Sequence, residues 1–257
     1  MIRSLSILMA FAPLLAPADA LSDKLTEAGI AEFTAAYRAW DGARFGAAAE
    51  LFRQASTNVS ANAINFYWLG VAEFHRLLQM RNPDADPTHL AAADVALDAA
   101  VDALTTAVKL DGRHAESHAL LATLYGMKIN GSLLRAAWYG PSVAKHRDQA
   151  MEFGAANPRV QYLLGMCQFH TAKKSAAWRE TLATLLAAEK LFETEAKVTA
   201  APLEPRWGHD SCLTFIGRTY EMLGQPAAAA AYFRRALEMH PQDSLAQAGL
   251  KRVMERK

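Results

Sequence analysis

Two histidines spaced by about one helical turn are the most direct candidate for metal chemistry in this sequence. His114 and His118 lie four residues apart in a segment predicted to be helical, so both imidazoles would share one face and could bind a metal ion. The residues between them give His-Ala-Glu-Ser-His, which is not the His-Glu-Xaa-Xaa-His pattern of zinc peptidases. We favour a structural interpretation, in which His118 packs between helices and His114 caps a helix or faces solvent.

Two pairs of cysteine and histidine are the second candidate. Cys167 and His170 lie three residues apart, as do His209 and Cys212, and together they could form a Cys₂His₂ site for zinc or copper. On parallel neighbouring helices the two pairs would differ by about ten residues, or roughly 15 Å of axial rise. The two cysteines would differ by about seven residues, or roughly 10 Å, which exceeds the reach of a disulfide. We therefore expect two reduced, buried cysteines.

Motifs for catalysis are not evident in the sequence. Asp84 and Asp86 have the character of solvated turn residues, and we find no phosphate-binding glycine loop and no nucleophile elbow. We expect that the protein is not an enzyme and that it needs no cofactor.

The spacing of small and aromatic residues near the C-terminus predicts two closely packed antiparallel helices. Counted from Asp210 as position 1, positions 8, 11, 15, 20, 24, 27 and 32 hold Gly217, Tyr220, Gly224, Ala229, Phe233, Ala236 and Pro241. Small residues allow the helices to approach, aromatic rings fill the space between them, and Pro241 ends the second helix. These offsets resemble those of a tetratricopeptide repeat.

Weaker forms of the same pattern precede this unit and extend over nearly the whole chain. They include "AYRAWDGARFGAAAELFRQAS", "NFYWLGVAEF" and "PRVQYLLGMCQFHTAKK", and the chain closes with the amphipathic segment "SLAQAGLKRVMERK". A single repeat cannot bury its apolar face alone, so neighbouring repeats must stack. We predict an all-α, TPR-like α-solenoid of about five helix pairs plus a C-terminal capping helix, formed by residues 21–257 as one domain.

Two segments interrupt the predicted repeats. Residues 81–94 contain Pro83 and Pro87 and are expected to form an insertion, and residues 130–142 are expected to be irregular. The second segment contains Trp138 and Tyr139. Both rings could anchor a partner, although we favour the alternative that they fill the gap between repeats.

Three short segments resemble a group of exported bacterial tetratricopeptide proteins. These are the Asn-Pro-Arg helix start at 157–159, the Leu-Phe-Glu helix end at 191–193 and the Trp-Gly pair at 207–208. The resemblance implies an exported scaffold that binds a partner and has no enzymatic activity.

The N-terminus and the charge balance indicate the compartment and exclude some partners. "MIRSLSILMAFAPLLAPADA" has the features of a signal peptide cut after Ala20, and its apolar run is too short to span a membrane. We therefore expect a periplasmic protein with no stable membrane insertion after cleavage. The net charge of +1 provides no broad basic surface, so neither nucleic acid nor an anionic membrane is an expected partner.

The first helix of each repeat should line a concave groove that binds a protein or peptide. Arginines would bind carboxylates or carbonyls of the partner, and aromatic rings would supply buried area. Self-association through repeat edges is possible. The alternative function is a metal-binding or metal-delivery protein that uses the histidines and cysteines above. The residues expected in the groove are Arg159, Tyr162, Met166, Phe169, His170, Thr214, Arg218 and Glu221.

Overall fold

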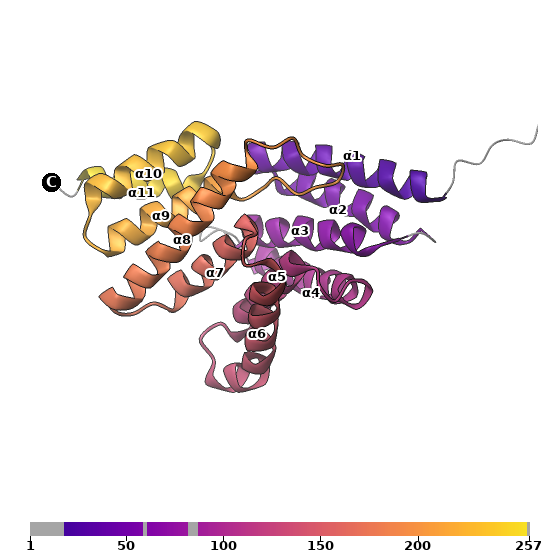
Figure 1. The fold of residues 1–257 in the computed structure, drawn as a ribbon, viewed down its shortest axis with the longest axis horizontal. Coiled ribbons are helices and arrows are strands. Elements are labelled where there is room, and N and C mark those ends of the chain that lie inside the picture. Colours follow the sequence, from indigo (N-terminus) through magenta and orange to yellow (C-terminus); the bar gives the residue numbers. More distant parts are fainter. Residues whose placement is uncertain (1–17, 59–60, 82–86, 256–257) are drawn as a thin grey trace, which may run out of the picture.

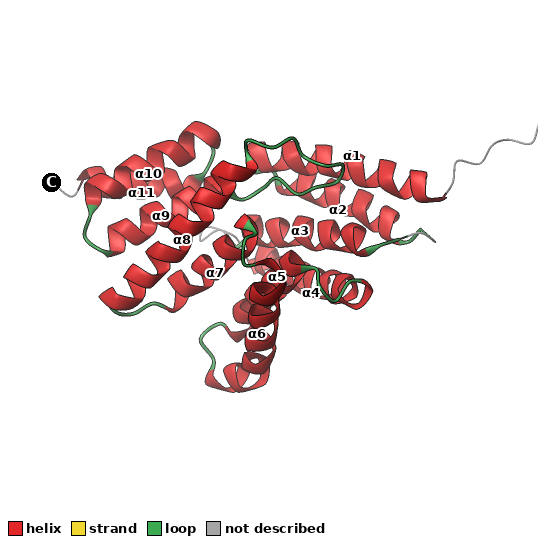
Figure 2. Ribbon diagram, in the orientation of Figure 1, coloured by secondary structure: helices red, strands yellow, loops and turns green. Residues whose placement is uncertain are grey.

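The computed structural model describes residues 18–58, 61–81 and 87–255. Within these ranges the chain forms eleven α-helices and no strand, which confirms the predicted all-α class (Figures 1 and 2). In the described part of the chain, no helix is both long enough and apolar enough to cross a membrane. The helices are α1 (Ala18–Ala39), α2 (Gly42–Ser56), α3 (Ala63–Met80), α4 (Pro87–Leu110), α5 (Ala115–Ile129), α6 (Leu133–Gly154), α7 (Pro158–Thr171), α8 (Ser175–Glu195), α9 (His209–Met222), α10 (Pro226–Met239) and α11 (Ser244–Glu255).

The helices pack as five consecutive pairs followed by a capping helix. Each odd-numbered helix from α1 to α9 packs on the helix that follows it, and α11 covers α10 and α9. This arrangement confirms the predicted α-solenoid. Most of the expected signal peptide lies outside the described residues, and α1 begins at Ala18, two residues before the end of that segment.

Close approach within the pairs depends on glycines at the predicted small-residue position. A Cβ atom on Gly70 would lie 2.5 Å from Leu104 Cγ, and one on Gly217 would lie 2.8 Å from the ring of Phe233. Both distances are shorter than a van der Waals contact, so a larger residue would push the paired helices apart. The local pattern of small and large residues therefore determines the geometry of each repeat.

Two helices begin earlier than the sequence patterns predicted. Helix α6 starts at Leu133, so most of the segment 130–142 is helical and includes Pro141. Ser132 caps this helix by accepting a hydrogen bond from the backbone of Arg135 at 3.3 Å, a signal that outweighs the internal proline. Helix α4 starts at Pro87, within the expected insertion at 81–94, of which residues 82–86 lie outside the described ranges.

The first and last repeats contact each other across the concave side of the solenoid. The hydroxyl of Tyr37 in α1 donates a hydrogen bond to Asp210 of α9 at 2.8 Å. The imidazole of His240 stacks on the Tyr37 ring, with 5.5 Å between the centroids. The hydrogen bond joins residues 173 positions apart in the chain.

Candidate functional site

A connecting segment between α8 and α9, residues 196–208, crosses the concave side, and we call it the strap. In Figure 1 it is the orange loop that reaches over the N-terminal helices before it returns to α9. The indole of Trp68 donates a hydrogen bond to the carbonyl of Leu203 at 2.9 Å, and the indole of Trp207 donates to the hydroxyl of Tyr67 at 3.0 Å. The strap thus occupies the face of α3 on which a ligand peptide was expected.

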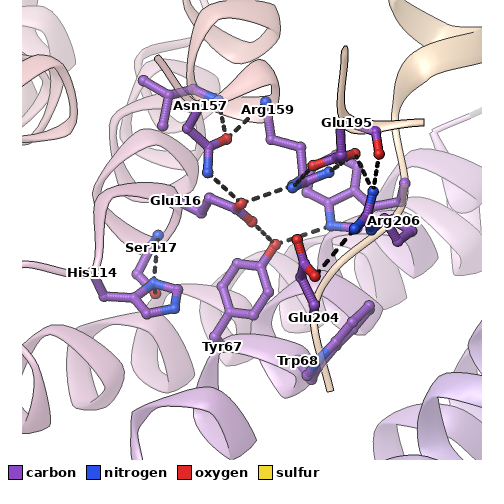
Figure 3. Close-up of polar contacts among 12 residues, drawn as sticks. Tyr67, Trp68, His114, Glu116, Ser117, Asn157, Arg159, Glu195, Glu204 and Arg206 are labelled. Atoms are coloured by element: carbon purple, nitrogen blue, oxygen red, sulfur yellow. Dashed lines mark hydrogen bonds and ion pairs between the residues drawn. The ribbon is translucent and has the colours of Figure 1, made fainter. Parts of the chain in front are cut away.

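A buried ion-pair network lies beside the strap (Figure 3). Arg159 donates through Nε to Glu116 at 2.7 Å and through Nη1 to Glu195 at 3.0 Å. Glu116 also accepts hydrogen bonds from Tyr67 and from the amide of Asn157, the latter at 2.7 Å. Helices α3, α5, α7 and α8 each contribute a side chain, so the network ties the middle repeats to the strap.

The environment holds Tyr67 and Arg159 in their protonated forms. Burial raises the pKa of Tyr67, and the neighbouring carboxylate of Glu116 raises it further, so Tyr67 remains a hydrogen-bond donor. Burial alone lowers the pKa of Arg159, but the charge of Glu116 and the hydrogen bond to Glu195 outweigh it and raise the pKa. The network lines an open cleft of about 720 Å³, yet its charges are paired with one another. These paired charges give the network a structural role, and we call it the clamp.

The three segments that carry the resemblance to exported repeat proteins meet at this clamp. Asn157 caps α7 by accepting a hydrogen bond from the backbone of Arg159 at 2.9 Å. The guanidinium of Arg159 lies 6.0 Å from the ring centre of Phe192. Trp207 packs edge-on against Tyr162. The repeat register selected Tyr67 as a residue that faces the groove, but sequence reasoning missed Glu116, because no spacing links it to Tyr67 or Asn157, which are 49 and 41 positions away.

A buried histidine lies beneath the strap. The His75 ring packs edge-on against Trp207 at 5.1 Å, and its Nδ1 lies 2.8 Å from the carbonyl of Val71. Burial lowers the pKa of His75 to about 4, although the hydrogen bond to Val71 and the charge of Asp210 act in the opposite direction.

Stability should therefore fall on acidification between about pH 6.5 and pH 4. In this window the unfolded chain binds a proton on His75 that the folded chain does not bind, so the stability contribution is complete above pH 6.5 and is lost as pH falls. The loss should reach about 3 kcal/mol at pH 4. Urea titrations at several pH values measure it, and His75→Gln should flatten this part of the profile. The same change at exposed His89 is the control, and identical profiles for His75→Gln and wild type would contradict the assignment.

Most residues expected in the groove belong to the core. Tyr162 is 4% exposed and packs against Trp207 and Phe215. The hydroxyl of Thr214 donates to Asp243 at 2.6 Å. Five of the eight expected groove residues are buried by neighbouring side chains, so the prediction that their side chains are open to a partner is corrected. The buried residues are Arg159, Tyr162, Met166, Phe169 and Thr214.

The remaining groove residues do reach the surface, and Arg218 is distinctive among them. Its guanidinium lies 4.4 Å from the ring centre of Phe169 and 5.0 Å from that of Phe215. The exposed imidazole of His170 packs against the same two rings. Burial and the charge of Arg252 lower the pKa of Arg218.

Two nearby carboxylates, Glu221 and Asp243, act on Arg218 only through their charges, which act to raise its pKa, while their hydrogen bonds go to other residues. Glu221 pairs with Arg252 at 3.0 Å, and Asp243 accepts from Thr214. Among the residues that the structure describes, none accepts a hydrogen bond from the Arg218 guanidinium. Arg218 is thus a cation held by two aromatic rings with its N–H groups available to a ligand.

The histidines proposed for metal binding have structural roles. His114 caps α5 by accepting a hydrogen bond from the backbone of Ser117 at 3.2 Å, as the structural interpretation predicted. His118 is buried, and its Nδ1 lies 2.8 Å from Nδ1 of His146, a partner that no sequence pattern indicated. His209 stacks on Phe192.

The two cysteines are unpaired thiols in separate environments. Cys167 lies 3.5 Å from the hydroxyl of Thr123, and the Sγ of buried Cys212 donates to the carbonyl of Leu185 at 3.5 Å. Within residues 18–58, 61–81 and 87–255, no three His, Cys, Asp or Glu side chains form a group suited to a metal ion.

Comparisons with known proteins agree with this architecture. Residues 211–253 match the family model of the tetratricopeptide repeat. A thermophilic TPR protein of Thermus thermophilus is similar in structure, with a TM-score of 0.63 and 15% identity over 91% of this chain and 98% of its own. The HusA haemophore from Porphyromonas gingivalis is also similar, with a TM-score of 0.59 and 16% identity over 82% of this chain and 96% of its own. No curated protein matches the sequence.

Proposed function

We propose that this tetratricopeptide-repeat protein is a non-catalytic scaffold that binds an acidic peptide segment of a partner protein at Arg218. The tetratricopeptide fold generally mediates interactions between proteins. The observation that supports this particular site is the guanidinium of Arg218, which lies against Phe169 and Phe215 and donates no hydrogen bond to a carboxylate of the described residues.

The aromatic support favours an anionic ligand for two reasons. Contact with two rings, which lie nearly perpendicular to each other, limits the motion of the guanidinium while its N–H groups stay available for hydrogen bonds to a carboxylate. Partial burial and the nearby charge of Arg252 disfavour the cation, as the lowered pKa of Arg218 indicates. A bound carboxylate would relieve both effects, so binding should depend on the negative charge of the peptide.

The same proposal places the protein in the periplasm after cleavage of residues 1–20. It is supported by the basic residue Arg3, the short apolar run and the Ala-Asp-Ala sequence at 18–20. Determination of the N-terminal residue of the protein recovered from a periplasmic fraction tests the proposal, and a mature chain should begin at Leu21.

The binding site is tested by replacing Arg218 with methionine, which keeps an apolar side chain over the two rings. Fluorescence anisotropy would measure binding of labelled octapeptides rich in Asp and Glu, with Lys-rich peptides of the same length for comparison. The variant should bind the acidic peptides about tenfold more weakly or worse, because a charge-assisted bidentate contact is lost. Arg234→Met, at an exposed position of α10, is the matched control. Equal binding by wild type and Arg218→Met, or no preference for acidic peptides, would contradict the proposal.

A further inference from the structure

The start of helix α6 exposes three large apolar side chains. Leu133, Leu134 and Trp138 are 89%, 82% and 78% exposed. Leu134 and Trp138 are one helical turn apart and therefore share a face, with Leu133 beside them. We call these three residues the α6 tip.

The exposure of the α6 tip follows from how α6 packs in the solenoid. Helix α6 packs mainly on α5 and has little contact with α7, so Ala150 is its one buried residue. Tyr139 points inward and stacks on Tyr125 at 5.9 Å, which leaves the neighbouring Trp138 facing outward. Figure 1 shows α6 in the part of the molecule that projects away from the other repeats. Trp138 therefore does not fill a gap between repeats, contrary to the interpretation we favoured from the sequence.

From residue 131 to residue 147 the charged residues have one sign, and Asp98 of α4 is paired with Lys128 beside Tyr139. No Asp or Glu occurs from residue 131 to residue 147, whereas Arg135, Lys145 and Arg147 are present. Arg147 pairs with Asp148, but the exposed guanidinium of Arg135, directly after Leu134, has no partner among the described residues. A projecting apolar end with an unpaired cation is complementary to a surface that is apolar inside and anionic outside.

We propose that the α6 tip inserts into the headgroup region of an anionic lipid bilayer and attaches the protein peripherally. Tryptophan favours the boundary between water and hydrocarbon, leucine side chains gain by entering the acyl region, and Arg135 pairs with lipid phosphates. A projecting end of this kind can enter a fluid bilayer directly. A protein partner would need a groove that matches its shape. From the near-neutral net charge of the chain we did not expect an anionic membrane as a partner. Net charge does not reveal how charges are distributed locally, and the α6 tip is such a local feature.

Sedimentation with lipid vesicles tests this inference on the mature chain, residues 21–257. Vesicles of phosphatidylglycerol and phosphatidylcholine should carry the wild-type protein into the pellet, and vesicles of phosphatidylcholine alone should carry less. Leu134→Glu combined with Trp138→Glu should reduce the partition coefficient at least tenfold, and Arg135→Glu should reduce it several-fold on anionic vesicles only. Leu245→Glu in α11 is the matched control, because Leu245 is an exposed apolar residue (50%) on a helix that packs on α9 and α10 rather than on α6.

Three results would overturn the inference. The first is absence of wild-type binding to anionic vesicles, and the second is equal binding by wild type and the double variant with unchanged circular dichroism. The third is a wild-type dimer in sedimentation velocity that the double variant abolishes, with no vesicle binding, which would assign the α6 tip to a second copy of the chain. Arg218→Met should bind vesicles like wild type, so this experiment is independent of the peptide site.

Discussion

Replacing Arg159 with methionine should lower the free energy of unfolding by about 3–5 kcal/mol, which is the usual cost of breaking a buried ion pair by removing one partner. The side chain of Arg159 is 3% exposed and contacts both Glu116 and Glu195. Methionine would fill much of the space but would leave the buried carboxylate of Glu116 without its cation, while Glu195 would keep only Arg206, 3.9 Å away. Urea denaturation followed by circular dichroism measures the change.

Two further variants separate the buried charge from ordinary packing. Arg44→Met removes a partly exposed arginine that pairs with Glu32 at 2.7 Å, outside the clamp, and it should change the stability little, because surface ion pairs contribute little. Adding Glu116→Gln to Arg159→Met should recover part of the lost stability, because one uncompensated charge is removed. A loss below about 1 kcal/mol for Arg159→Met would show that the clamp is not a stabilising element.

Replacing Trp207 with alanine should lower the free energy of unfolding by about 3–5 kcal/mol, the range for truncating a large buried aromatic side chain. Trp207 is 4% exposed, packs edge-on against His75 and Tyr162, and donates its indole N–H to Tyr67. Its removal would leave a cavity beneath the strap and would deprive Tyr67 of a donor. Thermal or urea unfolding gives the stability change.

The same variant should make the strap easier to cleave. Lys197 and Arg206 are exposed tryptic sites within the strap, and cleavage there requires local opening of the segment. Limited trypsin digestion with mass spectrometry should show faster cleavage at both sites in Trp207→Ala. Trp138→Ala is the control, because Trp138 is exposed and should change neither stability nor cleavage. Equal cleavage rates for wild type and Trp207→Ala would mean that other contacts hold the strap.

Features that depend on nearby residues could be predicted from the sequence. Gly70 and Gly217 occupy the predicted small-residue positions and contact the paired helix so closely that no larger residue fits. His114 caps α5 as the sequence indicated. The prediction that residues 130–142 are irregular was wrong, because the Ser132 cap and the packing of α6 on α5 outweigh the local effect of Pro141.

The candidate groove was predictable only in part. Repeat register places Phe169, His170 and Arg218 on one face, and the structure does bring them together. The same register also selected Arg159 and Tyr162, which the structure buries. Register determines the direction in which a side chain points from its helix, whereas burial depends on what later segments cover.

The amino-acid sequence by itself determined the class of fold, the pairing of neighbouring helices and the positions of the close contacts, because these follow from spacings within about 34 residues. Only the tertiary structure decided that Tyr37 meets Asp210, that the strap fills the face of α3, and that Trp138 is exposed. The contact between Tyr37 and Asp210 results from the small rotations between successive repeats, which accumulate along the solenoid, whereas the strap contacts and the exposure of Trp138 depend on how single segments pack; none of these leaves a periodic signal in the sequence.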